Sequence, residues 1–322
     1  MKLSVFNPVL ADMPFADAMK YLAQSGVQAV EIGSGGFPGK AHCDPTVLLN
    51  DDNALDAFAR VLAQNGLELA ALSTHGNPVH PDPEVARRFR DDFHDTVLLA
   101  EKLGCKRIIA FSGCPGGSPA DRTPNWVTCA WPPDFPQILD YQWNQVLIPY
   151  WREASAFAAA HGVEKIAFEM HPGFCVYNPE TLMRLRDAVG PLIGANLDPS
   201  HLFWQGVDIV AAIRYLKDAI YFFHAKDTCI DPLNCPVNGV LDTKNFNREA
   251  ERSWIFRSVG YGHDLLTWRN IVSNLRLVGY DDVLSIEHED SLMTPQEGLQ
   301  KAIAFLKDVL MFEEKNTRVF WA

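Results

Sequence analysis

The sequence predicts a (β/α)8 barrel, in which eight parallel strands, each followed by a helix, close on themselves. Short β-branched or apolar runs alternate with amphipathic segments along the whole chain, and parallel strands need such crossover helices. There are eight segments of each kind, which is the count for a closed barrel. No linker or shift in composition divides the chain, so residues 1–322 are predicted to form one domain.

The strand candidates are short runs rich in apolar residues, as expected of strands buried on both faces. They are Leu3–Phe6, Ala29–Ile32, Leu67–Ser73, Arg107–Phe111, Lys165–Glu169, Ile193–Asp198, Ile220–His224 and Val283–Glu287. The other segments have apolar residues at helical spacing. The predicted helices are Phe15–Ser25, Ala54–Asn65, Pro83–Leu103, Trp143–His161, Pro179–Val189, Ile209–Lys217, Leu265–Val278 and Pro295–Phe312. Several of them end next to a glycine, a common helix stop.

The main alternative is an open, doubly wound sheet. Such a sheet usually carries a glycine-rich turn after its first strand, whereas this chain reads Phe6-Asn7-Pro8-Val9 there. The run Gly33-Ser34-Gly35-Gly36 follows the second strand, but it lacks the spacing and the Lys-Ser/Thr pair of a phosphate loop. We interpret it as a plain turn, and the closed barrel remains the prediction.

Two connections are too long for simple turns. Residues Ser112–Gln142 follow the fourth strand and residues Ala225–Asp264 follow the seventh. Both therefore belong to the carboxyl end of the barrel, where barrel active sites are built. Long irregular segments in a compact domain are usually lids or binding loops, so we expect these two to roof the site.

The overall charge limits the choice of partners. The chain has 40 acidic and 28 basic residues and a formal net charge of −12. It repels polyanions, so nucleic acid is not an expected partner. A small sugar-sized molecule that is neutral, or anionic and held by a few local cations, fits better. No apolar run approaches the ~20 residues that a membrane-spanning helix needs, so no membrane association is expected.

The ends and the cysteines add two expectations. The start MKLSVFNPVLADMP lacks the basic, apolar and cleavage regions of a signal peptide, which predicts a cytoplasmic location. The seven cysteines are odd in number and form no CxxC pair, so reduced thiols are expected rather than a disulfide framework or a zinc knuckle. A homo-oligomer, dimeric or tetrameric, is compatible with the sequence, which leaves the oligomeric state open.

Four consecutive predicted strands, the fifth to the eighth, end in a residue that can bind a metal ion. These residues are Glu169, Asp198, His224 and Glu287. Because consecutive strands of a parallel barrel end on adjacent arcs of one rim, the four side chains can converge. Three carboxylates and one imidazole make a hard, mostly oxygen site. The sequence therefore predicts one divalent ion, with Mn²⁺ in first place and Mg²⁺, Co²⁺ or Zn²⁺ as alternatives.

Each of these residues also has an ordinary structural interpretation. A single carboxylate at a strand end is more often a helix N-cap than a ligand, and Asp198 before Pro199 fits a cap or turn. His224 follows two phenylalanines and fits a hydrogen-bonded core histidine. The set as a whole favours the metal, since three carboxylates in one cavity without a cation would repel one another strongly.

At these residues the chain resembles the sugar phosphate isomerase/epimerase superfamily with the xylose-isomerase-like TIM barrel. That superfamily includes ketose 3-epimerases, inosose dehydratases and isomerases, and endonuclease IV. The resemblance spans Met1 to about Leu310. Its most specific pieces are Glu169, Asp198-Pro199-Ser200-His201, His224-Ala225-Lys226-Asp227 and Glu287.

The resemblance implies roles for these residues. In the epimerases, the residues matching Glu169, Asp198, His224 and Glu287 hold one divalent ion. The two glutamates are also the acid/base pair, and the histidine matching His201 contacts the substrate. Such a pair suits chemistry at an α-hydroxyketone, because metal polarisation acidifies the C–H and two carboxylates on opposite faces can remove and return the proton. The same enediolate can instead expel a β-leaving group.

The nuclease branch fits less well. His75 matches another of its ligands, but that branch uses three metals and needs further histidines, including an Asp-x-His after strand seven. This chain reads Lys226-Asp227-Thr228-Cys229-Ile230-Asp231 after His224, and Phe111-Ser112-Gly113-Cys114 at the fourth strand. Neither run supplies those histidines, and DNA repair is not predicted.

Further residues are predicted to contact the substrate. His75 ends the third strand, His171 lies just beyond Glu169, and Lys226 can bring positive charge to an enediolate oxygen. Arg257 and His263 belong to mixed aromatic and basic runs in the seventh loop, which suit a sugar. Together with His201, the expected substrate contacts are His75, His171, Lys226, Arg257 and His263. Three tryptophans, Trp126, Trp131 and Trp204, are expected either to wall the pocket or to serve packing or an oligomer contact.

The predicted function is a divalent-metal-dependent isomerase or epimerase acting through an enediolate on a ketose or keto-sugar. Both long loops are larger than in the smaller ketose epimerases, which favours a larger substrate such as a keto-glycoside. The main alternative is a metal-dependent eliminase or dehydratase, a lyase or hydratase, on a keto-glycoside or inosose. A non-catalytic sugar-binding barrel is the third interpretation, and the two glutamates beside the metal site argue against it.

Overall fold

The computed structural model of the chain describes residues 1–315 and 321. Its centre is a closed barrel of eight parallel strands in the order β1-β10-β7-β6-β5-β4-β3-β2. The barrel strands are β1 (Lys2–Phe6), β2 (Ala29–Gly33), β3 (Glu68–Ser73), β4 (Arg107–Ala110), β5 (Lys165–Glu169), β6 (Ile193–Leu197), β7 (Ile220–Ala225) and β10 (Val283–Ile286). Each expected strand lies within one residue of an observed one at both ends, and the predicted fold class is confirmed.

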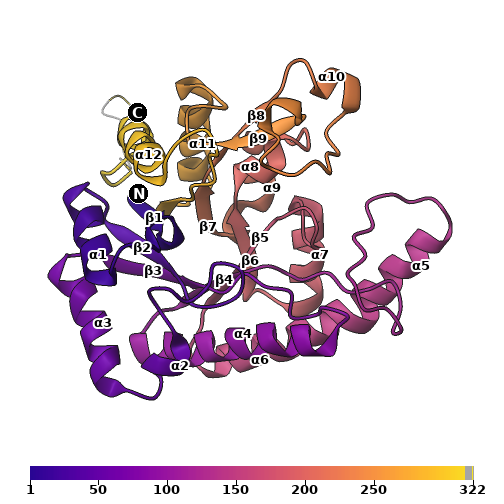
Figure 1. Ribbon diagram of the computed structural model, residues 1–322, viewed down its shortest axis with the longest axis horizontal. Coiled ribbons are helices and arrows are strands. Elements are labelled where there is room, and N and C mark those ends of the chain that lie inside the picture. Colours follow the sequence, from indigo (N-terminus) through magenta and orange to yellow (C-terminus); the bar gives the residue numbers. More distant parts are fainter. Residues whose placement is uncertain (316–320, 322) are drawn as a thin grey trace.

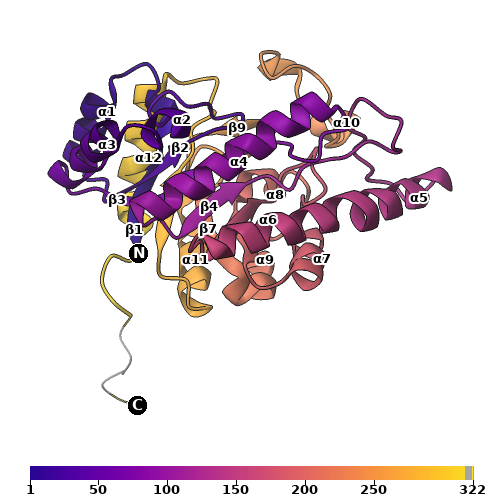
Figure 2. The same cartoon turned by 90° about the horizontal axis from the view of Figure 1, so that it is seen from below.

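Helices surround the barrel (Figures 1 and 2). The main ones are α1 (Phe15–Gln24), α3 (Asp52–Gln64), α4 (Pro83–Leu103), α6 (Ile148–Ala160), α7 (Pro179–Val189), α9 (Ile209–Leu216), α11 (Leu265–Leu277) and α12 (Pro295–Val309). Shorter pieces are α2 (Pro45–Leu48), α5 (Asp134–Asp140), α8 (Pro199–Phe203), α10 (Cys235–Asn238) and the turns η1 (Asn7–Leu10), η2 (Tyr141–Leu147), η3 (Lys217–Ala219) and η4 (Glu249–Glu251). None of the described helices is long and apolar enough to cross a membrane.

Local sequence explains where the helices begin and end. The Asp82 carboxylate accepts from the amides of Glu84 and Val85 and caps α4, and Gly104 ends that helix at φ 68°. A left-handed residue at this position favours glycine, which has no Cβ to clash. These start and stop signals are local, and the two bounds of α4 agree with the sequence prediction.

The two long connections are more ordered than the sequence suggested. A helical stretch begins at Asp134 and runs through the π-helical turn η2 into α6, so the irregular part of the fourth connection ends before α5. Pro149, in the first turn of α6, has no N–H, which is consistent with the interrupted α-helical bonding before it. The seventh connection contains an antiparallel pair, β8 (Asp227–Ile230) and β9 (Trp254–Arg257). Both α5 and α10 project away from the barrel (Figure 1).

The barrel interior is apolar at one end and polar at the other. Small and aromatic residues fill the inner cluster: Ala29, Ala70, Ala71, Ile109, Ala167, Phe222 and Val283. The guanidinium of Arg107 lies over the Phe222 ring and pairs with Asp282 at this end. Since side chains pack this end, the space for chemistry lies at the carboxyl ends of the strands, as in other barrels of this kind.

Candidate metal centre

Four side chains converge at the carboxyl end of the barrel. Glu169 is the last residue of β5, Asp198 follows β6, His224 lies in β7 and Glu287 follows β10. One ligand atom from each lies within 4.8 Å of the others. The first three side chains are buried, and that of Glu287 is 15% exposed. These are the four residues that the sequence analysis selected as metal ligands.

Three of the converging atoms make no regular hydrogen bond among the described residues: Asp198 Oδ2, His224 Nδ1 and Glu287 Oε2, although both carboxylate oxygens lie near the Lys226 ammonium. His224 Nδ1 lies 3.2 Å from Glu287 Oε2 and 3.3 Å from Glu169 Oε2. Buried polar atoms are rarely left without partners, and an ion is one of the usual reasons. The donor set of three carboxylates and one imidazole fits a divalent cation.

The cap interpretation of Asp198 and the ligand interpretation are both compatible with the geometry. Its Oδ1 accepts from the amide of Ser200 at 2.8 Å and caps the short helix α8. This hydrogen bond fixes the carboxylate in the direction that leaves Oδ2 facing the cluster. The local motif Asp198-Pro199-Ser200 therefore sets the orientation of one of the four converging side chains.

The cluster holds more negative charge on its carboxylates than the neighbouring cationic side chains balance. Burial raises the pKa of Asp198, against the effect of the Lys226 ammonium. Burial acts in the same direction on Glu169, but hydrogen bonds from His201 and His75 and the nearby imidazole of His224 hold the pKa of that carboxyl well below its usual range. For Glu287 the pKa is also lowered, since the nearby Lys226 ammonium outweighs burial. A bound divalent cation would add the missing charge.

Lys226 brings a positive charge of the protein's own to the cluster. Its side chain is buried, and Nζ lies 3.2 Å from Asp198 Oδ2, 2.7 Å from Glu287 Oε2 and 2.8 Å from Glu289 Oε2. These carboxylates raise the pKa of Lys226 well above its ordinary value although burial acts against them. The lysine is therefore a permanent cation beside the cluster.

Three further histidines surround Glu169. The Nε2 atoms of His75 and His201 lie 3.0 and 2.9 Å from the two oxygens of that carboxylate. The ring of His171 lies against that of His201, with centroids 4.0 Å apart. Burial lowers the pKa of His171 to about 3, so this imidazole is neutral at physiological pH and can exchange hydrogen bonds with a bound molecule.

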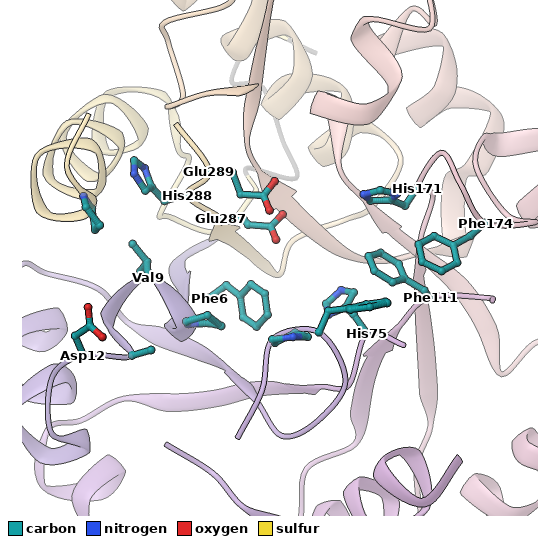
Figure 3. A pocket seen from close by; sticks show the side chains of 15 residues that line it. Phe6, Val9, Asp12, His75, Phe111, His171, Phe174, Glu287, His288 and Glu289 are labelled. Carbon is teal, nitrogen blue, oxygen red and sulfur yellow. The ribbon is translucent and has the colours of Figure 1, made fainter. Parts of the chain in front are cut away.

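A cavity of about 750 Å³ opens onto the cluster. Glu287, Glu289, His75 and His171 contribute to its lining. In Figure 3, Glu287 and Glu289 lie in the middle of the pocket, with Phe111 and Phe174 on one side of them and Asp12 and His288 on the other. Among the sequence-predicted substrate contacts, His75 and His171 line this cavity, whereas His201 and Lys226 are buried behind it.

Arg257 and His263 have other partners. Arg257 Nε donates to Asp290 Oδ2 at 3.1 Å, and its guanidinium lies over the Tyr261 ring. His263 Nδ1 lies 2.7 Å from Asp227 Oδ1, and its ring stacks on Phe203. Neither residue is part of the cavity lining as far as the structure describes it. Arg257 and His263 therefore pair with the buried carboxylates of Asp290 and Asp227.

Of the two expectations for the tryptophans, the pocket wall is wrong for this cavity, because none of the three is part of its lining as the structure describes it. Trp126 lines a separate, smaller cavity, Trp131 is 73% exposed, and Trp204 stacks on Trp254. Phenylalanines take that place instead. Phe37 from the loop after β2, Phe111 after β4 and Phe174 after β5 form a continuous aromatic group, with ring centroids 4.3 to 6.5 Å apart. The seventh connection reaches the site through Phe256, whose ring contacts His201 and Lys226.

Glu31 is the main residue that the sequence analysis missed. It lies in β2, is fully buried, and both its carboxylate oxygens lie about 3 Å from His224 Nε2, at 3.0 and 2.9 Å. One signal was available. Glu31 is the single charged residue in the otherwise apolar strand Ala29–Gly33, and a buried charge needs a partner.

A comparison with known proteins shows that most of the chain matches one protein family. Residues 19–309 match the family described as "Xylose isomerase-like TIM barrel". Among curated proteins, YfiH of Bacillus subtilis is 41% identical over 312 residues, which cover 96% of this chain and 99% of that protein. An inosose dehydratase of Mesomycoplasma hyopneumoniae is 23% identical over 303 residues, covering 93% and 90% of the two chains.

Solved structures share the fold at low identity. The 3-keto-D-glucoside 4-epimerase YcjR of E. coli aligns with a TM-score of 0.67 and 14% identity, covering 96% of this chain and 99% of that one. The IolI protein, whose structure holds a zinc atom, aligns with a TM-score of 0.66 and 20% identity over 96% and 98% of the two chains. At such identities the likeness concerns the fold.

Proposed function

The chain belongs to the xylose isomerase-like TIM-barrel family, and on this premise we propose that it is a divalent-metal-dependent enzyme that isomerises or epimerises a ketose or keto-sugar. The observation that carries the proposal is the convergence of Glu169, Asp198, His224 and Glu287 within 4.8 Å beside an open cavity. These four residues would hold the ion, with Mn²⁺ as the first choice because oxygen ligands predominate. The IolI structure, which shares the fold and holds a zinc atom, is consistent with a metal in this chain.

The ion would supply Lewis-acid polarisation of the sugar's carbonyl and hydroxyl oxygens. The protein's own groups would move the proton. Glu169 ends β5 and Glu287 follows β10, and these two strands are separated around the barrel by β6 and β7, so their carboxylates approach the site from different sides. Both have lowered pKa values and are ionised at neutral pH, as a general base must be. Removal of the proton on one side and its return on the other would invert the carbon.

Neighbouring residues would orient the substrate and stabilise charge. His75 and His171 face the cavity, where ring nitrogens can bond sugar hydroxyls. Lys226 would stabilise negative charge that develops on a substrate oxygen, in a setting where burial strengthens electrostatic effects. His201 would hold Glu169 in place and, with Phe256 packed over it, help to exclude water.

The cavity favours an uncharged substrate. Asp12, Glu287 and Glu289 contribute carboxylates, and no lysine or arginine is part of the lining as described in residues 1–315. A phosphorylated or carboxylated sugar would meet this negative charge without a matching cation at the surface. We therefore propose a neutral sugar or keto-glycoside.

The phenylalanine group favours a second candidate function, the elimination of a group from a keto-glycoside or inosose. A phenyl ring offers no hydrogen bonds, so Phe37, Phe111 and Phe174 suit an apolar substituent on the sugar better than its hydroxyls. Such a substituent would be the leaving group of a β-elimination that begins with the same proton removal. The similarity to an inosose dehydratase is consistent with this candidate.

One experiment tests both candidates. The Mn²⁺-loaded protein is incubated in D2O with a panel of ketoses, inososes and 3-keto-glucosides, and the products are followed by NMR. Deuterium beside the carbonyl together with a new stereoisomer or isomer is the expected result for the first candidate. Release of the substituent with an unsaturated sugar identifies the second. Binding of sugars without any deuterium incorporation would contradict both and leave a binding protein.

The phenylalanine group gives a further prediction. Phe37 is 63% exposed in the structure, so Phe37→Ala removes aromatic surface from the cavity mouth with little effect on the core. We expect KM for substrates with an apolar substituent to rise about 5-fold, within the ~0.5–1.5 kcal/mol of one aromatic contact, and KM for free ketoses to change little. Leu266→Ala, at an exposed apolar position of α11, is the control. An equal rise for both substrate classes would argue against the assigned role.

A further inference from the structure

Glu31 is a buried carboxylate to which the proposed proton transfer gives no task. Four contacts fix it inside the barrel. Ser73 Oγ donates to Oε1 at 2.5 Å and Ser285 Oγ donates to Oε2 at 2.8 Å. His224 Nε2 lies 3.0 Å from the first oxygen and 2.9 Å from the second. The two hydroxyl groups orient the carboxylate so that both of its oxygens face the imidazole.

The two nitrogens of His224 face different surroundings. Nε2 points to Glu31 on β2, although the two residues are 193 positions apart in the chain. Nδ1 points to Glu169 and Glu287 and has no hydrogen-bond partner in the described part of the chain. The Phe6 ring lies along one face of the imidazole, with centroids 5.6 Å apart and planes inclined by 26°. The ring is therefore fixed in direction as well as in position.

We propose that Glu31 is a positioning residue of the metal centre, which accepts the Nε2–H of His224 and so assigns Nδ1 as the nitrogen that binds the ion. This inference rests on the proposed function, since it needs an ion at the four converging residues. A neutral imidazole has one donor and one acceptor nitrogen, and the hydrogen bond made by one nitrogen determines the role of the other. A carboxylate behind a ligating histidine fixes its tautomer and raises its basicity.

Among the described residues, Glu31 is the group placed to accept the Nε2–H of His224. The other carboxylates of the cluster, Glu169 and Glu287, lie on the Nδ1 side of the ring. Among the described residues, Nε2 has hydrogen-bond contacts with Glu31 alone. Without that acceptor nothing would hold the proton on Nε2. The ring could then turn and offer Nε2 to the ion instead of Nδ1, and its contact with Phe6 would change.

The test uses two variants of Glu31 in the full-length chain. Glu31→Gln keeps an acceptor oxygen but removes the charge, and Glu31→Met removes both. Mn²⁺ affinity is measured by calorimetry, and we expect it to fall about 10–100-fold, more for methionine than for glutamine, as outer-shell partners of metal ligands usually show. Glu68→Gln is the matched control, since Glu68 is an exposed glutamate at the opposite end of the neighbouring strand β3.

A second measurement separates positioning from general stability. In ¹⁵N-histidine-labelled, Zn²⁺-loaded protein, two-bond correlations should show His224 coordinated through Nδ1 with a proton on Nε2. In Glu31→Met this pattern should be lost or mixed, while the Glu68→Gln spectrum stays unchanged. Should the methionine variant fail to fold, Ser285→Ala serves in its place, because it removes one donor to Glu31; it should lower Mn²⁺ affinity less than Glu31→Gln does.

The outcomes are distinguishable. Wild-type affinity and an unchanged Nδ1 pattern in both Glu31 variants would overturn the inference and leave the metal centre intact, as would coordination of the wild type through Nε2. An ion bound as described, with no proton exchange on any sugar, would overturn the proposed function and leave the role of Glu31 standing. Failure of the wild-type chain to bind Mn²⁺ or Zn²⁺ would overturn both.

Discussion

Glu287→Gln and Glu169→Gln are each expected to lower turnover by at least ~10²-fold, because glutamine cannot take up or return the proton. Glu287 is the more exposed of the two and lines the cavity, so its loss should act directly on the reacting carbon. Glu169 is held by His75 and His201, which a neutral amide would pair with less well. Steady-state rates on the substrate found in the D2O panel give the measurement.

Both glutamates are also proposed ligands, so the loss must be separated from loss of the ion. Mn²⁺ content is determined for each variant under assay conditions, and rates are compared at saturating metal. Glu164→Gln, an exposed glutamate just before β5, is the control for a simple loss of charge. Full activity of either variant with the ion bound would refute the two-glutamate mechanism.

Asp198→Asn is expected to weaken Mn²⁺ binding by at least ~10²-fold, since loss of an outer-shell partner alone costs 10–100-fold. The substitution is selective because Oδ1, which caps α8 through the Ser200 amide, is kept. Only Oδ2, which faces the cluster and lies 3.2 Å from Lys226 Nζ, becomes an amide nitrogen. Activity should fall with the ion, and thermal stability of the metal-free protein should change little. Calorimetry and Mn²⁺ electron paramagnetic resonance measure the affinity.

A matched control exists in the same chain. Asp208 caps α9 through the amide of Ala211, as Asp198 caps α8, but it is exposed and outside the cluster. Asp208→Asn should therefore leave Mn²⁺ affinity unchanged. If the Asp198 and Asp208 variants behave alike, Asp198 is a helix cap and the four-residue metal centre is wrong.

Much of the fold could be predicted because its signals are local. Strands buried on both faces are short apolar runs, and the glycines after several helices mark their ends. The convergence of Glu169, Asp198, His224 and Glu287 also followed from the sequence, because parallel order places consecutive strand ends on one rim. The structure brings their ligand atoms together.

The surroundings of the site could not be predicted in the same way. Arg257 and His263 have the residue types of sugar contacts, but the pairing of β8 with β9 and the buried Asp227 and Asp290 give them other partners. Three tryptophans were one expectation for the aromatic wall, whereas Phe37 and Phe174, from the loops after β2 and β5, line the cavity. Side-chain direction in an irregular loop depends on its packing, which composition does not determine.

The sequence by itself determined the barrel and the four residues at its rim. Both follow from apolar periodicity and from the position of strand ends, and these are local features that span only a few residues each. Only the tertiary structure decided which groups stand behind and around those four. Glu31 meets His224 across 193 positions, and Lys226 turns into the cluster rather than to solvent. Such contacts are fixed by closure of the barrel, which brings distant strands together in a buried space where each charged group must find a partner.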